Sequence, residues 1–483
     1  MDPNHRRDHL PVAVIGAGPV GLAAAAHLLA HGEDPVVFEA GPVVGAGVLA
    51  WGHVRLFSPW RYVVDDATRS LLEAAGWVEP DLEGFPTGRE LVDRYLAPLA
   101  ALPALRPRIR LDARVVAVAR DGVDKMKTEG RDEAPFLLTV RTAAGREEPF
   151  LAKAVIDASG TSGTPNPLGA SGIPALGERD LADRIFAGIP DVLGIHRDRY
   201  AGKRVLVAGS GHSAFNALLD LVALADEAPG TEITWAVRKP ADRLRTLFGG
   251  GINDALPARG ALGERVRRLV EDNRLRLATG FRAARLTATS EGIVVAAEDE
   301  VLPPVNEIVV ATGYRPDLAM LAELRLDLDP AIESPAALAP LIDPNVHSCG
   351  SVPPHGAEEL KHPEPDLYLV GMKSYGRAPT FLMLTGYEQV RSVAAAIAGD
   401  WAAAREVRLV LPETGVCSTD ILAERGVTCC AAAATIPEGE TASCCGASAT
   451  TDPAAGCCGG VAPQVIQLTA AARGACCGPA AEG

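Results

Sequence analysis

The sequence predicts an α/β fold that contains two separate parallel sheets. Two segments, residues 11–40 and 204–237, follow the same order of an apolar strand, a glycine-rich turn, a helix and a second strand. They begin roughly 190 residues apart, which is typical of two domains rather than of one sheet. The chain of 483 residues also exceeds the length that one hydrophobic core usually organises.

The remaining elements are predicted from shorter patterns. Strands are expected where β-branched and apolar residues lie between turn residues, at residues 113–119, 136–142, 154–158, 307–310 and 367–371. A helix is expected over residues 380–398. We therefore predict one domain from residues 1–200 and 317–400, a second domain inserted into it at 201–316, and a tail at 401–483. The tail is rich in Ala, Gly and Cys and is predicted to be largely disordered.

Composition and charge exclude several classes of protein. The chain is 48% hydrophobic and 22% charged, which is ordinary for a globular protein. Its net charge of −15 argues against nucleic acid as a partner, because phosphate contacts need a basic face. The sequence has neither a recognisable signal peptide nor an apolar run long enough to cross a bilayer. We therefore expect no membrane association and a cytoplasmic location.

The first glycine turn predicts a dinucleotide site. Gly16, Gly18 and Gly21 form a G-x-G-x-x-G pattern between an apolar strand and a helix. Such glycines allow a tight turn, a close approach of the pyrophosphate and close packing of helix on strand. Glu39 ends the second strand, where a carboxylate accepts hydrogen bonds from ribose hydroxyls.

The second turn predicts another dinucleotide site with a different specificity. Gly209, Gly211 and Ser213 repeat the pattern, and Ala214 stands in the place of the third glycine. The second strand of this unit ends in Arg238 and Lys239 rather than in an acid. Cations at this position pair with a 2′-phosphate, which favours NADPH over NADH. The alternative is that both side chains only solvate a strand end.

Together these motifs resemble the flavin-containing monooxygenase superfamily. The resemblance covers roughly residues 11–398 and also rests on the segment from Gly45 through Gly47 to Trp51 and on the ATGYRP segment with Thr312 and Gly313. It implies FAD at the first turn and NADPH at the second, with Gly371 as a further cofactor-binding residue. The family's linker pattern is present in Phe186-Ala-Gly188 and His196 to Tyr200, but seven residues separate Gly188 from His196 instead of three.

The absence of a redox CxxC motif narrows the chemistry. Related disulfide reductases need such a pair beside the flavin, and this sequence has none. Electrons from NADPH are therefore expected to pass through FAD to O₂ or directly to a small-molecule substrate. The resemblance implies that one oxygen atom of O₂ is transferred to a soft nucleophile, with the flavin carrying the chemistry. The sequence suggests no acid–base pair or triad, so no catalytic residue is assigned.

The tail contains four pairs of cysteines in which the two members are adjacent in sequence: Cys429-Cys430, Cys444-Cys445, Cys457-Cys458 and Cys476-Cys477. Their irregular spacing does not match a tetrahedral zinc site. Neighbouring thiolates suit soft species such as Cu(I) or trivalent arsenic, so these cysteines are candidate ligands. The alternatives are a low-complexity tail without a ligand, or a tail that carries reducing equivalents.

The tail also points to a branch of the resembled family. The segment LVLPETGVCS at residues 409–418, together with the Cys-Cys-Gly repeats, resembles monooxygenases associated with actinobacterial arsenic resistance. This implies a trivalent arsenical as substrate or ligand and a thiol donor as a candidate partner. Two alternative functions stay open, an NADPH oxidase or reductase of a small molecule and a metalloid-sequestering flavoprotein. The oligomeric state is left open too.

Two further segments each allow two interpretations. The aromatic and basic residues from Trp51 to Arg61 could line the flavin or could be ordinary core aromatics with surface arginines. His347, Cys349, His355 and His362 could hold a metal, but their spacing lacks a ligand pattern, which favours a surface loop.

Overall fold

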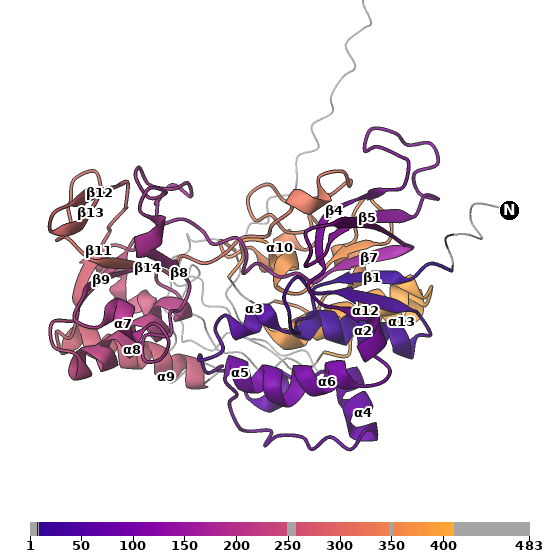
Figure 1. The fold of residues 1–483 in the computed structure, drawn as a ribbon, viewed down its shortest axis with the longest axis horizontal. Helices are drawn as coiled ribbons and strands as arrows, with labels where there is room; N and C mark the ends of the chain where they lie inside the picture. The colour runs from indigo at the N-terminus through magenta and orange to yellow at the C-terminus, as the bar shows by residue number, and fades with distance from the viewer. Residues whose placement is uncertain (1–6, 8, 249–256, 347–351, 380, 410–483) are drawn as a thin grey trace, which may run out of the picture. The chain divides into compact units, whose positions relative to one another are not determined.

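A computed structural model describes residues 7, 9–248, 257–346, 352–379 and 381–409 of the chain. The described residues form an α/β structure with two five-stranded parallel sheets and two smaller antiparallel sheets (Figure 1). Among these residues, no helix is long and apolar enough to cross a membrane. The predicted fold class, with two Rossmann-like parallel sheets, is confirmed; the domain boundaries stay a prediction.

The first parallel sheet has the strand order β15-β7-β1-β2-β3. Its strands are β1 (Val12–Ile15), β2 (Pro35–Phe38), β3 (Ile109–Arg110), β7 (Ala154–Asp157) and β15 (Leu367–Leu369). β1, β7 and β15 are buried along their whole length, as expected for a sheet covered on both faces. The chain leaves this sheet after β7 and returns to it with β15, which pairs with β7 in parallel.

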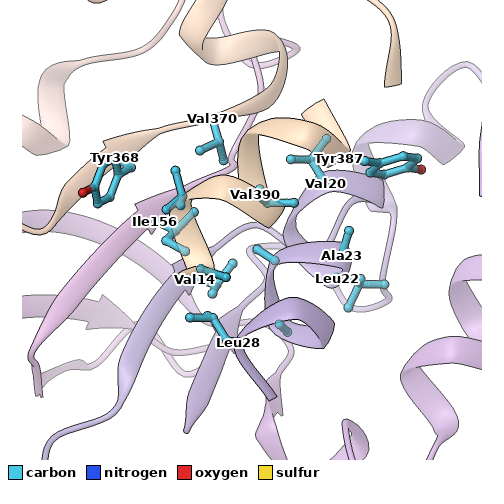
Figure 2. Close-up of a cluster of buried hydrophobic side chains, with 14 of the residues drawn as sticks. Val14, Val20, Leu22, Ala23, Leu28, Ile156, Tyr368, Val370, Tyr387 and Val390 are labelled. Carbon is cyan, nitrogen blue, oxygen red and sulfur yellow. The ribbon is translucent and has the colours of Figure 1, made fainter. Parts of the chain in front are cut away.

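Two helices cover one face of this sheet, α2 (Pro19–Ala30) and α12 (Met383–Ile397). Figure 2 shows Val20 and Leu28 of α2 and Val390 of α12 in one cluster with strand residues Val14 and Ile156. The run of alanines from Ala23 to Ala26 leaves little side-chain bulk, so α2 packs close to its neighbours. The other helices of this part of the chain are α3 (Ala46–Leu49), α4 (Asp66–Ala74), α5 (Gly88–Leu91), α6 (Ala97–Ala101), α10 (Ala339–Ile342), α11 (Ala357–Leu360) and α13 (Trp401–Arg405).

An antiparallel sheet lies between β3 and β7 in the sequence and consists of β4 (Arg114–Arg120), β5 (Phe136–Arg141) and β6 (Glu147–Ala152). Alternate residues of β5 are buried, which is the pattern of a sheet with one face on a core. Phe136 and Leu138 share that core with Leu321 and Leu324 from a later part of the chain.

The second parallel sheet has the strand order β11-β10-β9-β14-β8. Its strands are β8 (Ile185–Ala187), β9 (Arg204–Ala208), β10 (Glu232–Val237), β11 (Arg276–Thr279) and β14 (Glu307–Val310). Its helices are α7 (Arg197–Tyr200), α8 (His212–Glu227) and α9 (Pro257–Glu271), and a hairpin of β12 (Arg285–Thr289) and β13 (Gly292–Ala296) precedes β14. Trp235 is fully buried in the core of this sheet and packs against Phe215 of α8.

The strands predicted from the sequence are found within one or two residues of their expected bounds. The last helix differs more, because α12 begins at Met383 rather than at residue 380. Its N-cap residue Leu382 is extended, with φ −115° and ψ 144°, so the helical pattern starts only after it. Residue 380 and the tail from 410 onward lie outside the described residues.

A buried charge cluster joins the antiparallel sheet to the segment that precedes β15. Arg120 donates to Glu364 at 2.7 Å and Arg131 donates to its other carboxylate oxygen at 2.5 Å. The three side chains are at most 1% exposed. Burial alone would raise the pKa of Glu364, but the hydrogen bonds from Arg131 and Arg120 lower it overall. The cluster therefore needs the ionised carboxylate.

We expect Glu364→Ala to lower the free energy of unfolding by about 3–5 kcal/mol, because it leaves two buried guanidinium groups without their anion. Denaturation in urea measures this loss. The control is Glu147→Ala, which removes an ion pair with Arg141 that is 49% exposed on both sides and should cost less than about 1 kcal/mol.

Since the pKa of Glu364 is lowered in the fold, its contribution to stability is present above pH 4.5 and is lost as pH falls through the lowered value. The stabilities of the wild type and of Glu364→Ala should therefore converge in acid. An equal loss of stability from Glu364→Ala and Glu147→Ala would contradict a stabilising role of the buried cluster.

Candidate functional site

The first glycine turn connects β1 to α2 and is held against the end of β7. Gly16 has φ +100°, a left-handed conformation that favours glycine. A Cβ at Gly16 would lie 2.7 Å from the carbonyl oxygen of Ala158. The turn therefore needs glycine here both for its conformation and for its packing against the segment that follows β7.

The other two glycines of this turn have different roles. A Cβ at Gly21 would lie 1.9 Å from the carbonyl oxygen of Gly16, so glycine lets α2 approach the turn. A Cβ at Gly18 would have no heavy atom of the described residues within 4 Å, and the extended φ of −81° suits any residue. Gly18 therefore faces open space at the N-terminus of α2, where a diphosphate is stabilised by backbone N–H groups and the helix dipole. The residues present fit such a group.

Glu39 lies directly after β2, beside this turn. It is 9% exposed, and its carboxylate accepts hydrogen bonds from the backbone N–H of Ala17 at 2.8 Å and of Gly41 at 2.9 Å. These bonds fix the carboxylate at the carboxyl ends of β1 and β2, where ligands bind in parallel sheets. The position agrees with the predicted role toward a ribose, which stays a prediction.

The segment with Gly45, Gly47 and Trp51 is only partly joined to this turn. Gly45 has φ +67° and its N–H donates to the carbonyl of Ala17, so it lies against the first turn. A Cβ at Gly47 would lie 3.3 Å from the hydroxyl of Ser162, which follows β7. Trp51 packs instead on the backbone of Gly88, where a Cβ would lie 2.8 Å from the indole.

Gly371 brings the turn after β15 to the same place. It has φ +65°, and a Cβ there would lie 3.3 Å from the side chain of Val20 at the start of α2. Its N–H donates to Gln389 Oε1 at 2.7 Å. Gln389 Nε2 in turn lies 2.8 Å from Ser374 Oγ and 2.9 Å from His355 Nε2. The sequence did not predict this buried network, which fixes the Gly371 turn.

His355 is neutral in this network. Its Nδ1 lies 3.0 Å from the carbonyl of Pro353, so Nδ1 carries the proton and Nε2 accepts from Gln389. Burial lowers the pKa of His355, which is 3% exposed. His362 is 8% exposed, and burial lowers its pKa to about 4. The interpretation of this segment as a surface loop is therefore wrong for both histidines. Among the described residues, no three or more His, Cys, Asp and Glu side chains come together as a metal site would require; residues 347 and 349 lie outside them.

The second glycine turn connects β9 to α8 and repeats the geometry of the first. Gly209 has φ +132°, and a Cβ there would lie 2.2 Å from the carbonyl oxygen of Ala311, which follows β14. Gly211 at the N-cap of α8 is extended, and a Cβ there would have no heavy atom of the described residues within 4 Å. Ser213 lies half-buried in the first turn of α8, and Ala214 is fully buried. The N-terminus of α8 is thus a second open position for phosphate.

Arg238 and Lys239 follow β10 at the same edge of this sheet. Arg238 is exposed, and Lys239 is half-buried beside Arg243. Burial, and then the charge of Arg243, lowers the pKa of Lys239. The strand end therefore gathers three cations, of which sequence patterns identified two.

Thr312 and Gly313 lie after β14, where they bind the segment that follows β7. The hydroxyl of Thr312 donates to the carbonyl of Asn166 at 2.8 Å, and the Asn166 amide donates to the carbonyl of Thr312 at 3.2 Å. Gly313 has φ +88°. Their direct contacts are thus with the connection between the two parallel sheets.

The linker pattern assembles in spite of its unusual spacing. The ring of Phe186 lies 5.0 Å from that of His196 in an edge-to-face arrangement. His196 Nδ1 accepts from the backbone N–H of Asp191. Gly188 has φ +105°, and a Cβ there would lie 2.5 Å from the hydroxyl of Tyr314. The extra residues are accommodated between Gly188 and His196 without separating the two rings.

The segment from Trp51 to Arg61 divides between the two interpretations. Trp60 is 3% exposed and belongs to the core, and Arg61 is exposed and pairs with Glu83. These two residues are an ordinary core aromatic and a surface arginine. Phe57 differs, because its ring lies 5.4 Å from that of His212 at the start of α8. The paired cysteines from Cys429 to Cys477 lie outside the described residues, so their role stays a prediction.

Comparison with known proteins agrees with this geometry. A family model described as pyridine nucleotide-disulphide oxidoreductase matches residues 10–364. The ferredoxin–NADP reductase of Salinispora tropica is 28% identical over 320 residues, which are 66% of this chain and 78% of the relative. Monooxygenase cfoE of Aspergillus candidus is 30% identical over 228 residues, 45% of this chain and 34% of the relative. The structure of bacillithiol disulfide reductase from Bacillus cereus shares the fold, with a TM-score of 0.59, 20% identity and coverage of 81% and 99%.

The two parallel sheets with their glycine turns thus define a flavoprotein oxidoreductase with two dinucleotide sites. The chain belongs to the pyridine nucleotide-disulphide oxidoreductase family. It is an enzyme that uses FAD and NAD(P)H, as predicted. The residues that bind each cofactor, and the choice of NADPH, stay predictions.

The glycine geometry gives a matched set of substitutions. Gly18→Ala adds a methyl group in open space, so it should leave folding unchanged but raise the Kd for FAD by about tenfold or more by obstructing the diphosphate. Gly211→Ala should raise the Kd for NADPH by a similar factor without affecting FAD.

Gly21→Ala is the contrasting control, because its methyl group would meet the Gly16 carbonyl and lower the free energy of unfolding by about 1–3 kcal/mol. FAD fluorescence quenching measures the Kd for FAD, titration of the FAD-loaded protein with NADPH measures the Kd for NADPH, and urea denaturation measures the stability. Normal FAD binding by Gly18→Ala would show that the diphosphate does not approach this turn.

Proposed function

We propose that the protein is an NADPH-dependent FAD monooxygenase that oxidises a soft heteroatom centre. NADPH supplies two electrons, one oxygen atom of O₂ enters the substrate, and the other leaves as water. When bound, FAD supplies the hydride acceptor and the activation of O₂. The chain itself binds and orients the two dinucleotides through its glycine turns and the cations after β10.

The observation that carries this proposal is the absence of a CxxC motif from the sequence. The family is named for disulphide reduction, but the sequence has no pair of cysteines with the CxxC spacing. Reducing equivalents from FAD must then reach O₂ or a diffusible acceptor. The similarity to a fungal monooxygenase supports the first of these outcomes.

We further propose a trivalent arsenical as the substrate class. Arsenic(III) is soft, carries a lone pair that accepts an oxygen atom, and binds strongly to neighbouring thiolates. The four adjacent cysteine pairs of the tail provide such thiolates in this chain. They would raise the local concentration of the arsenical near the flavin domain of the same molecule, as a tethered binding module does.

A reductase function is the second candidate, and a specific observation favours it. Ferredoxin–NADP reductases match about two thirds of the chain, a greater share than the monooxygenase relative covers. In that case FAD would pass electrons singly to a protein acceptor, without incorporation of oxygen. The two candidates differ in the fate of O₂.

Isotope labelling distinguishes them. With arsenite, methylated arsenite, a thioether or an amine as candidate substrate, NADPH oxidation under ¹⁸O₂ should place one labelled atom in the product. NADPH consumption should stop without oxygen. Unchanged turnover in anaerobic buffer with a ferredoxin or another electron acceptor would support the reductase function and exclude the monooxygenase.

The role of the tail is tested in the full chain by replacing its eight paired cysteines with serine. We expect the KM for the arsenical to rise roughly tenfold while kcat at saturation stays unchanged, because only local substrate concentration is lost. Unchanged kinetics would exclude a role for the pairs. Loss of arsenic binding with no effect on any turnover would indicate sequestration instead.

The cofactor preference gives a separate prediction. Replacing both Arg238 and Lys239 with Ala should raise the KM for NADPH by roughly 10–100-fold, because a 2′-phosphate loses two charge-assisted partners. The KM for NADH should change little. Lys203→Ala is the control, since Lys203 is an exposed cation before β9, at the opposite end of the strands. Equal losses for NADPH and NADH would contradict recognition of the 2′-phosphate.

A further inference from the structure

A buried ion pair lies at the carboxyl ends of β7 and β15. Lys373 Nζ is 2.6 Å from Asp157 Oδ2, and both side chains are 0% exposed. Asp157 is the last residue of β7 and stands opposite Leu369, the last residue of β15. Burying two charges costs several kcal/mol in desolvation, and apolar residues of the same size would hold a core at least as well. Stabilisation of the core alone therefore does not explain why a buried ion pair occupies this position.

The pair is connected to an accessible residue. Ser159 is exposed, and its hydroxyl donates to Asp157 Oδ1 at 2.6 Å while it accepts from Lys373 Nζ at 3.0 Å. The Ser159 N–H also donates to Asp157 Oδ1. Among the described residues, these contacts use two of the three N–H donors of the lysine. The buried charges thus reach the edge of the sheet through one side chain.

Residues close in sequence to each member of the pair lie against the first glycine turn. The segment after Asp157 lies behind Gly16, where a Cβ would be 2.7 Å from the Ala158 oxygen and 3.0 Å from the Ser159 Cα. The turn before Lys373 holds Gly371 against Val20 at the start of α2. Lys373 therefore joins the two segments, after β7 and after β15, that lie against the turn and the start of α2.

We propose that Lys373 is a positioning residue of the FAD site. Through Asp157 and Ser159 it fixes the segments after β7 and β15 at the separation that bound FAD requires. The charge of the pair is balanced, so the Gly16 turn has no uncompensated carboxylate beside the anionic diphosphate. This role in FAD binding does not depend on the substrate class proposed above.

A double substitution in the full chain separates positioning from stability. Asp157→Asn with Lys373→Met removes both charges, keeps an acceptor for the Ser159 N–H and leaves no unpaired ion, so folding should be preserved. We expect its Kd for FAD to rise about tenfold or more, with a shifted absorption band for the flavin that remains bound. FAD fluorescence, the visible spectrum and urea unfolding of the FAD-free protein are measured together.

Two further variants keep the test decisive. Ser159→Ala removes one hydroxyl at an exposed position and keeps the ion pair, so the FAD-free protein should stay folded with a small decrease of its unfolding midpoint, while FAD binding weakens several-fold. Lys153→Met is the matched control: Lys153 pairs with Glu33 at 2.5 Å at the amino ends of the strands of the same sheet, and FAD affinity should not change. Wild-type FAD affinity and spectrum in both Ser159→Ala and the double variant would overturn the proposal. If the double variant does not fold, the Ser159→Ala result decides alone.

Discussion

The contact between Gly16 and the segment after β7 is the constraint on which the cofactor site depends. A side chain at Gly16 would enter the Ala158 carbonyl, and one at Gly21 would enter the Gly16 carbonyl. The end of β1, the turn and the start of α2 can therefore pack this closely only because Gly16 and Gly21 have no side chain. That approach leaves the N-terminus of α2 uncovered, so the same absence of side chains packs the core and opens the phosphate position.

The second sheet follows the same rule with different residues. Gly209 approaches the Ala311 carbonyl as Gly16 approaches that of Ala158, and Gly211 is as open as Gly18. Ala214 occupies the third glycine's place and is fully buried without a clash, so this position tolerates a methyl group where the first turn does not. The two turns differ most at the ends of their second strands, where Glu39 follows β2 while Arg238 and Lys239 follow β10.

Local patterns in the sequence were sufficient for the parallel sheets and both glycine turns, because strand, turn and helix are adjacent in the chain. They were not sufficient for the buried polar groups. Lys373 and Asp157 lie 216 residues apart, and Arg120 and Glu364 lie 244 residues apart. The residues next to each of these four in the sequence do not distinguish it from a charge on the surface. Only the pairing of β15 with β7 brings such residues together.

The place of β15 has a consequence for how the chain is made. β15 and α12 complete the first sheet and its core, yet they leave the ribosome after all strands of the second sheet. During synthesis the edge of β7 that later pairs with β15 therefore stays unpaired, while residues 185–310 can already form their own sheet. The first sheet is thus completed only after the second can form, and until then the free edge of β7 is open to mispairing.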